Sequence, residues 1–305
     1  MKILHVVPSL DNPFNGIAVA AKLIAGEQAA EMVDVREFGK IKDLAKYEKV
    51  WVHSCWLPMT LKACRRVVKA KRQLVRMTHA NLDPVRLRYH GWKKWLVGPI
   101  ERYWLRKADR IVATCDAEKA WIEACLGKKC PKVVVEDIKR FFDFSRKERK
   151  ENEGNGSKQE IGNKKLNVLY LGRRHPLKGV EYLEAAVAEL NAGSRSRESK
   201  LDSGIGNFDS KQIELKIVSD AFGEEKEKVW EWCDVLVLPT LSENFGLVVA
   251  EALERGKRVI TTDGAPAWGD GNDYGGRLMY LKGYRDGSDE ARVRLLRDTL
   301  MLIVG

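Results

Sequence analysis

Short apolar runs alternate with segments of helical period along the chain. In the first half, runs bounded by polar or turn residues predict buried strands at Ile3–Val7, Lys49–His53, Gln73–Met77 and Arg110–Thr114. Apolar residues three or four positions apart predict helices between them, at Ala18–Ala30, Thr60–Lys71, Trp92–Lys107 and Ala117–Leu126. Strands that alternate with helices form βαβ units, so the pattern predicts α/β folding around a parallel sheet.

The same alternation returns after Leu166. Strands are expected at Asn167–Leu171, Glu214–Val218, Asp234–Leu238 and Arg258–Thr262, and helices at Val180–Leu190, Leu247–Arg255 and Glu290–Ile303. The stretch from Ser145 to Glu160 contains no apolar residue and resembles a solvated linker. We therefore expect an N-terminal domain over 1–144, a linker over 145–165, a C-terminal domain over 166–285 and a helix over 286–305 that packs back across the domains.

Composition narrows the class of protein. The 305 residues, 44% of them hydrophobic, are enough for two cores, and no apolar run approaches the roughly 18 residues of a membrane-spanning helix. The first apolar run stops at Pro8, which indicates a buried strand rather than a signal peptide. Six cysteines without a Cys-x-x-Cys pair favour reduced thiols over zinc. We expect a cytoplasmic protein, with a position at the inner face of the membrane as an option.

The net charge of +11 is concentrated in one stretch. Residues 61–150 contain 25 Lys and Arg against 10 Asp and Glu, whereas the rest of the chain is slightly acidic. Such a field favours an anionic partner, and nucleic acid, lipid headgroups and an acidic substrate all remain open.

Two loops carry candidate chemistry in the second half. Leu238–Leu253 passes from a buried strand through a polar loop into an apolar helix, where free backbone N–H groups would stabilise an anion. Its carboxylates, Glu243 and Glu251, suit hydroxyl groups, although a helix cap and a surface ion pair would explain them equally well. Gly172–Gly179 also follows a strand, and it sets Arg173 and Lys178 where two phosphate charges could be met.

These motifs resemble a known family. Gly-Arg-x-x-x-x-Lys-Gly at Gly172–Gly179, and Ser-Glu-x-Phe-Gly-x-x-x-x-Glu-Ala at Ser242–Ala252, are similar to those of the retaining GT-B glycosyltransferases of family 4. The loop Met77–Pro84 resembles the one that carries an active-site histidine, and Pro8–Gly16 resembles a glycine-containing first loop. The resemblance implies a GT-B fold: two Rossmann-like domains that face each other across a cleft.

The resemblance also implies roles for individual residues. Arg173 and Lys178 would hold the diphosphate of a nucleotide sugar, and Glu243 and His79 would lie near the sugar and act with them in catalysis. The remaining residues implied in nucleotide-sugar binding are Gly16, Asn244, Phe245, Gly246, Leu247 and Glu251. The acceptor would attack from the face of the leaving group, and neither metal nor cofactor is implied; the donor substrate is expected to be a UDP-sugar.

Residues 92–107 mix aromatic and basic side chains. Trp92, Lys93, Lys94 and Trp95 predict a patch for an anionic membrane or an acceptor, although the aromatic side chains could equally be core. His5 and His53 fall in predicted strands and are expected to be structural.

We therefore expect a retaining, metal-independent hexosyltransferase. It would transfer sugar to a glycan or lipid-linked acceptor in the synthesis of cell-surface polysaccharide or lipopolysaccharide, with no nucleic acid as partner. Two alternatives remain: a basic nucleic-acid-binding protein, and an inactive GT-B protein that binds a nucleotide sugar. The short segment between Ile217 and Trp230, where this family usually contacts the nucleotide base, motivates the second alternative.

Overall fold

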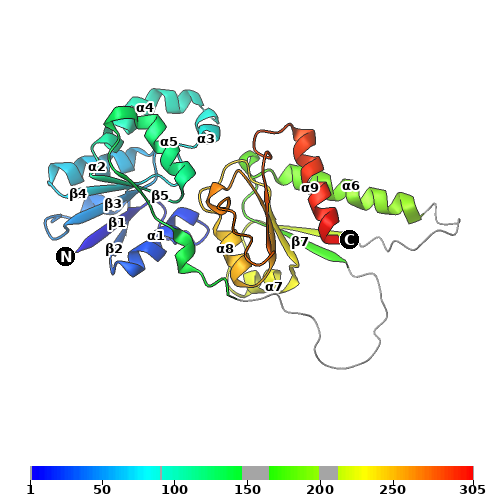
Figure 1. Cartoon of the computed structure of the whole chain (residues 1–305). Coiled ribbons are helices and arrows are strands. Elements are labelled where there is room, and N and C mark those ends of the chain that lie inside the picture. The colour runs from blue at the N-terminus through cyan, green and yellow to red at the C-terminus, as the bar shows by residue number, and fades with distance from the viewer. Residues whose placement is uncertain (1, 90, 146–164, 199–211, 305) are drawn as a thin grey trace. The chain divides into compact units, whose positions relative to one another are not determined.

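The computed structural model describes residues 2–89, 91–145, 165–198 and 212–304, apart from the side chains at 92, 93 and 193–198. These residues form two compact units (Figure 1). The first comprises Met1–Phe141 with Asn244–Leu247, and the second comprises Phe142–Glu243 with Val248–Gly305. The expected linker lies almost wholly outside the described residues.

The first unit is built on a parallel sheet of six strands in the order β2-β1-β3-β4-β5-β6. The strands are β1 (Ile3–Val7), β2 (Glu31–Asp34), β3 (Lys49–His53), β4 (Gln73–Met77), β5 (Arg110–Ala113) and β6 (Val133–Val135). The helices are α1 (Gly16–Glu27), α2 (Pro58–Lys69), α3 (Pro84–Arg88), α4 (Gly91–Arg106) and α5 (Asp116–Leu126).

Apolar side chains on both faces of this sheet explain its runs of Val, Ile and Leu. The larger cluster joins Val50, Leu74 and Ile111 of the strands with residues of α2, α4 and α5, such as Val67. A smaller cluster joins Val7 of β1 with Ala18 and Ala21 of α1. The helices therefore anchor the sheet through buried apolar contact, and the loops at the ends of the strands remain available for polar side chains.

The second unit contains a parallel sheet of five strands in the order β11-β10-β9-β7-β8. The strands are β7 (Leu166–Leu171), β8 (Ile213–Val218), β9 (Val235–Leu238), β10 (Arg258–Thr262) and β11 (Leu278–Leu281). The helices are α6 (Val180–Glu198), α7 (Glu224–Trp232), α8 (Leu247–Glu254) and α9 (Asp289–Val304). Every residue of the central strand β9 is buried, as its sequence Val-Leu-Val-Leu predicts.

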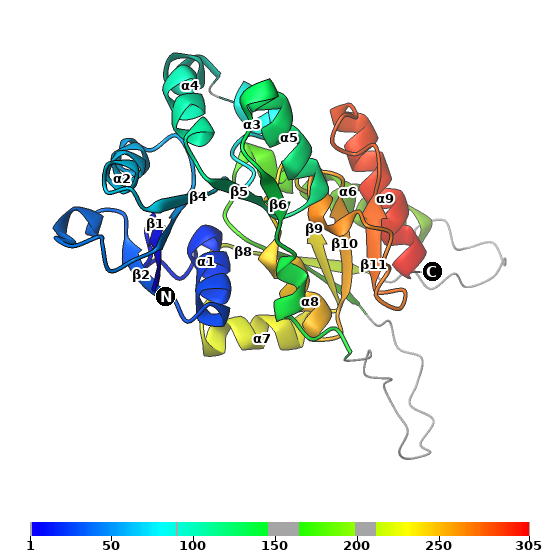
Figure 2. The same cartoon turned by 60° about the vertical axis from the view of Figure 1, so that its left-hand side comes forward.

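The helix α9 packs along α6, as both views of the molecule show (Figure 2). Arg297 of α9 forms an ion pair with Glu189 of α6 at 3.2 Å. The contact belongs to the second unit, and the expected extension of this helix across both domains stays a prediction.

Candidate donor-binding loops

Polar loops gather at the carboxyl edge of the second sheet. Neighbouring strands β7, β9 and β10 each end there and are followed by Gly172, Pro239 and Asp263. Backbone hydrogen bonds fasten the three loops together: Leu241 N donates to Leu177 O at 2.9 Å, and Glu243 N donates to Gly264 O at 2.7 Å. The cationic motif and the motif with two glutamates are therefore parts of one structure.

Two glycines allow these loops to approach so closely. Gly179 has a φ of +61°, and a Cβ at this position would lie 2.3 Å from Pro239 O. A Cβ on Gly264 would lie 2.0 Å from Thr240 O. Any side chain at either position would push the loops apart.

Lys178 and Glu243 form an ion pair across the two motifs. Their side chains are only 15% and 16% exposed, so the pair is shielded from much of the solvent. The loop N-terminal to Lys178 is held by Tyr170, whose hydroxyl donates to Arg173 O at 3.0 Å. Burial, assisted by the charge of Glu243, raises the pKa of Tyr170 and keeps this donor protonated.

Arg173 lies in the same loop and is exposed. Across the described parts of the chain, its guanidinium forms no ion pair or hydrogen bond. The adjacent Arg174 is instead held by Glu184 at 2.6 Å. Of these two neighbouring arginines, Arg173 is therefore the one whose guanidinium is available to bind a ligand.

Glu251 lies one turn into α8 and is held by Lys226 of α7. The ammonium of Lys226 is 2.8 and 2.7 Å from the two carboxylate oxygens. The ion pair expected as the alternative for Glu251 thus exists, and it is partly buried. Lys226 was not predicted, because the apolar signal of α7 is sparse, with only Val229 and Trp230 buried.

The N-terminus of α8 completes this edge. Phe245 is buried and precedes Gly246, which has a φ of +74°, and the helix begins at Leu247. The helix dipole adds partial positive charge to that of Arg173 and Lys178. This edge can therefore bind a multiply charged anion and, through its carboxylates, the hydroxyl groups of a sugar.

The predicted active-site histidine, His79, belongs to the first unit. It follows β4 in a turn where both His79 and Ala80 have positive φ values, +53° and +54°. Glu118 of α5 holds this turn, because its Oε1 accepts hydrogen bonds from Thr78 Oγ1, at 2.6 Å, and from Ala80 N. The other oxygen of Glu118 accepts from Thr114 N at 2.7 Å, so a buried carboxylate outside the predicted set builds the loop.

Gly16 is the first residue of α1, in the same unit. Asn15 caps this helix, and its side-chain oxygen accepts a hydrogen bond from Ile17 N at 3.1 Å. The predicted first loop therefore ends at the N-terminus of a helix.

The predicted patch on α4 is partly as expected. Trp95, Leu96, Ile100 and Tyr103 are exposed, so the alternative that the aromatic side chains are core is wrong for Trp95 and Tyr103. Lys94 differs from the prediction of an outward cation, because its ammonium donates hydrogen bonds to the carbonyls of Arg86 and, at 2.9 Å, Tyr89. These carbonyls lie at the C-terminal end of α3, where a cation is favoured. The side chains of Trp92 and Lys93 lie outside the described residues.

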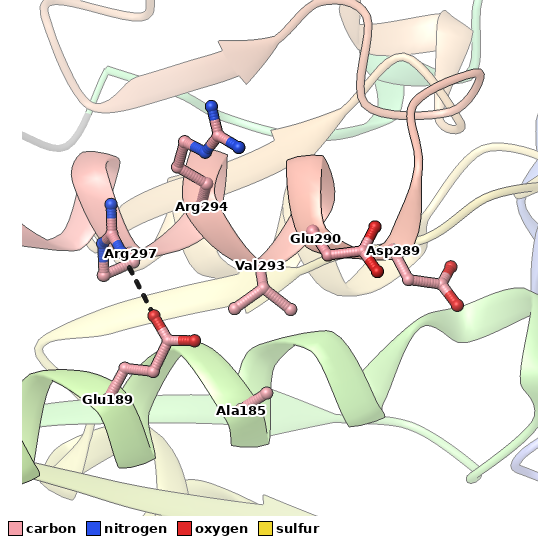
Figure 3. A pocket seen from close by; sticks show the side chains of 7 residues that line it. All are labelled: Ala185, Glu189, Asp289, Glu290, Val293, Arg294 and Arg297. Atoms are coloured by element: carbon pink, nitrogen blue, oxygen red, sulfur yellow. Dashed lines mark hydrogen bonds and ion pairs between the residues drawn. The ribbon is translucent and has the colours of Figure 1, made fainter.

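A surface pocket also lies between α6 and α9, lined by Ala185, Glu189, Asp289, Glu290, Val293, Arg294 and Arg297 (Figure 3). Charged side chains dominate it, and Glu189 and Arg297 are joined across it. No residue of either predicted motif lines it.

Both halves of the chain match models of glycosyltransferase domains. Residues 11–136 match the glycosyl transferase 4-like domain, and residues 165–296 match the glycosyl transferases group 1. The chain belongs to the group 1 glycosyltransferases. The matched regions contain the residues predicted from sequence in both units, and the prediction of a group 1 glycosyltransferase is confirmed.

Two known proteins are similar to about half of this chain. An uncharacterized 41.2 kDa protein in the cps region of Klebsiella pneumoniae is 29% identical over 175 residues, which are 56% of this chain and 48% of that protein. A D-inositol 3-phosphate glycosyltransferase 2 of Catenulispora acidiphila is 26% identical over 175 residues, 50% of this chain and 40% of that protein. The aligned region thus spans about half or less of these relatives.

Solved structures show the fold of this group 1 chain. Sucrose-phosphate synthase of Thermosynechococcus elongatus aligns with a TM-score of 0.62 at 12% identity, over 99% of this chain and 90% of that one. HepE of Anabaena, in complex with UDP and glucose, aligns with a TM-score of 0.58 at 17% identity, over 98% of this chain and 90% of that one. With the two parallel sheets, these neighbours confirm the Rossmann-like, two-domain GT-B fold.

Proposed function

We propose that the chain is a retaining glycosyltransferase that transfers a sugar from a nucleotide-diphosphate sugar, with a UDP-sugar as the favoured donor, to a glycan or lipid-linked acceptor. Membership of group 1 supports glycosyl transfer as the reaction. The complexes of the neighbour HepE with UDP and UDP-glucose support the class of donor. The relative from a cps region supports a role in the synthesis of cell-surface polysaccharide or lipopolysaccharide.

One observation carries this proposal: hydrogen bonds join the two motifs at the carboxyl edge of the second sheet. Arg173, Lys178 and the N-terminus of α8 supply positive charge at the ends of adjacent strands. A departing diphosphate develops negative charge as the bond to the sugar breaks, so preorganised positive charge at this position lowers the barrier. The protein's own cations would neutralise the leaving group, and the proposal therefore involves no resident metal or cofactor.

The ion pairs of the site suggest how a donor enters it. The diphosphate would replace Glu243 as the partner of Lys178, and the carboxylate so released would accept hydrogen bonds from hydroxyls of the sugar. Glu251, oriented by Lys226, would accept hydrogen bonds from the ribose. Binding thus exchanges one charge-assisted contact of Lys178 for another rather than exposing a buried charge. The acceptor would attack from the face of the leaving group, which retains the configuration of the anomeric carbon.

The exposed face of α4 would bring the enzyme to its acceptor. We name Trp95, Leu96, Ile100 and Tyr103 the α4 patch. The helix α2 packs against α4 and exposes the cations of Lys62, Arg65 and Lys69. Interfacial aromatic side chains next to cations are typical of surfaces that bind anionic membranes, where a lipid-linked acceptor would lie. Within the described residues, no helix is both long and apolar enough to span a bilayer.

Product analysis tests the reaction. We would incubate the full chain with UDP-, GDP- and ADP-sugars and follow the anomeric proton of the released or transferred sugar by NMR. Retention of configuration with one donor is expected, and inversion would contradict the mechanism. Glu243→Gln should lower turnover by about 10²-fold or more, because it weakens a contact to the reacting sugar, whereas Glu184→Gln, a matched change of an exposed carboxylate, should leave it unchanged. Donor binding without any turnover would support the inactive alternative instead.

A further inference from the structure

Three buried histidines of the first unit form a continuous line of hydrogen bonds. His5 Nδ1 lies 2.9 Å from His53 Nε2, and His53 Nδ1 lies 2.9 Å from His79 Nε2. The side chains are at most 1% exposed. The line continues beyond His79, whose Nδ1 lies 3.0 Å from Asn244 Nδ2.

The register of the sheet explains this line. His5 on β1 is in register with Trp51 on β3, and the two rings stack 4.9 Å apart. His53 lies two residues further along β3, on the same face of the sheet. It is in register with Met77 on β4, two residues before His79. Each histidine therefore lies one step further towards the carboxyl edge.

All three rings are neutral at physiological pH. Burial lowers the pKa of His5 to about 4 and that of His79 to about 3. Burial and the neighbouring histidines lower the pKa of His53 well below its usual value. A neutral imidazole has one N–H donor and one acceptor nitrogen, so each ring must donate in one direction and accept from the other.

Gln28 determines that direction. It is the half-buried C-cap residue of α1, and its Oε1 lies 3.1 Å from His5 Nε2. An amide oxygen only accepts hydrogen bonds, so His5 carries its proton on Nε2 and accepts at Nδ1. His53 must then donate from Nε2 and accept at Nδ1, and His79 must donate from Nε2. This leaves His79 Nδ1 as an acceptor, and Asn244 donates to it from Nδ2.

We propose that Gln28, His5 and His53 are positioning residues that fix His79 in the tautomer with a proton on Nε2 and an acceptor at Nδ1. This proposal rests on the proposed function for its consequence: Nδ1 of His79 accepts a hydrogen bond from Nδ2 of Asn244 and so holds one of the predicted donor-binding residues. The opposite tautomer would meet that amide with an N–H group. A glutamine at the end of α1 thus determines the chemistry of the active-site histidine through two further rings.

We call the line of hydrogen bonds from Gln28 through His5 and His53 to His79 the relay. Nitrogen NMR of the ligand-free full chain, labelled at histidine with ¹⁵N, tests it. Long-range proton–nitrogen correlations distinguish the two neutral tautomers, and variants in which one histidine is replaced by glutamine assign the signals. At pH 7.5 we expect the Nε2–H form for His5, His53 and His79. Gln28→Lys places a donor beside His5 and should convert His79 to the Nδ1–H form. Gln28→Glu retains an acceptor and should leave the tautomers as they are. An Nδ1–H form of His79 in the wild type, or no change in Gln28→Lys, would overturn the proposal.

Donor kinetics test the consequence separately. Gln28→Lys should raise the KM for the donor about five- to tenfold, because Asn244 loses the hydrogen bond that holds it, whereas Gln28→Glu should leave the KM unchanged. Inverted tautomers with an unchanged KM would overturn the role of the relay in binding. If the wild type turned over no donor, the proposed function would fail, while the tautomers would still support or overturn the relay.

Discussion

At the scale of single residues, the predicted donor contacts depend on neighbours that no motif names. Arg173, Lys178, Glu243 and Glu251 were found by their spacing, because the first three lie in loops at strand ends and Glu251 lies one turn into the helix that follows. Lys226 and Glu118 were not, because a partner distant in sequence leaves no periodic signal. His5 and His53 were expected to be structural, and they do form hydrogen bonds with each other. Their line to His79 depends on the register of three strands, which the sequence alone does not specify.

The close approach at Gly179 makes a prediction about stability and binding. Gly179→Ala adds a methyl group 2.3 Å from Pro239 O at a positive φ. We expect the free energy of unfolding to fall by about 3 kcal/mol, from backbone strain and overpacking together, and binding of nucleoside diphosphate to weaken. Gly276→Ala is the matched control, because Gly276 has a φ of +80° with nothing within 4 Å of the added group. This control should lower the free energy of unfolding by only about 1 kcal/mol. If urea unfolding showed the same loss of free energy of unfolding for both variants, the explanation given for Gly179 would be contradicted.

The three buried histidines predict a pH dependence of stability. Their folded-state pKa values are lowered, to about 4 for His5 and about 3 for His79, so below pH 6.5 the unfolded chain binds protons that the folded chain does not. Stability is therefore full above pH 6.5 and is lost as the pH falls. Between pH 7 and 5.5 the loss should be about 1.3 kcal/mol for each histidine and roughly 4 kcal/mol in all.

Urea unfolding at the two pH values measures this loss. His5→Gln removes one of the three groups, and its pH dependence should be smaller by about a third. A free energy of unfolding that is the same at pH 7 and 5.5 in the wild type would show that the histidines are not held neutral.

At the scale of elements, segments with a clear apolar or periodic pattern were predicted well and strands at the edges of the sheets were missed. The strands β1, β3, β4 and β7–β10 and the helices α2 and α5 lie within a few residues of their expected positions. The short strands β2, β6 and β11 were not predicted. They lie at the edges of their sheets, where partial exposure weakens the apolar pattern. The helix α4 continues through Pro99.

The α4 patch predicts binding to anionic vesicles. Trp95→Ser removes a side chain that is 78% exposed and should reduce flotation with anionic vesicles severalfold, because an interfacial aromatic anchor is lost. Leu302→Ser on α9 is a matched control, since Leu302 is also 78% exposed. It should float like the wild type. Equal flotation of both variants would contradict a membrane role for α4.

At the scale of the whole molecule, the basic excess and the proposed donor site lie in different halves of the chain. The basic excess of residues 61–150 belongs to the first unit and the start of the linker, whereas the proposed donor-binding loops have a few cations at strand ends of the second. A nucleic-acid-binding protein would instead use the basic excess itself. Its binding would fall steeply with salt and would survive the loss of Glu243 and Glu251.

Calorimetric titration of the full chain with UDP, GDP and ADP tests the central claim most directly. We predict that one of them binds, and that Arg173→Ala with Lys178→Ala weakens its binding at least tenfold, because two charge-assisted contacts to the diphosphate are lost. Arg174→Ala, which removes the neighbouring cation paired with Glu184, should bind like the wild type. Absence of binding for all three nucleotides at millimolar concentration, or equal binding by the double variant, would contradict the claim that these loops hold a nucleotide-diphosphate sugar.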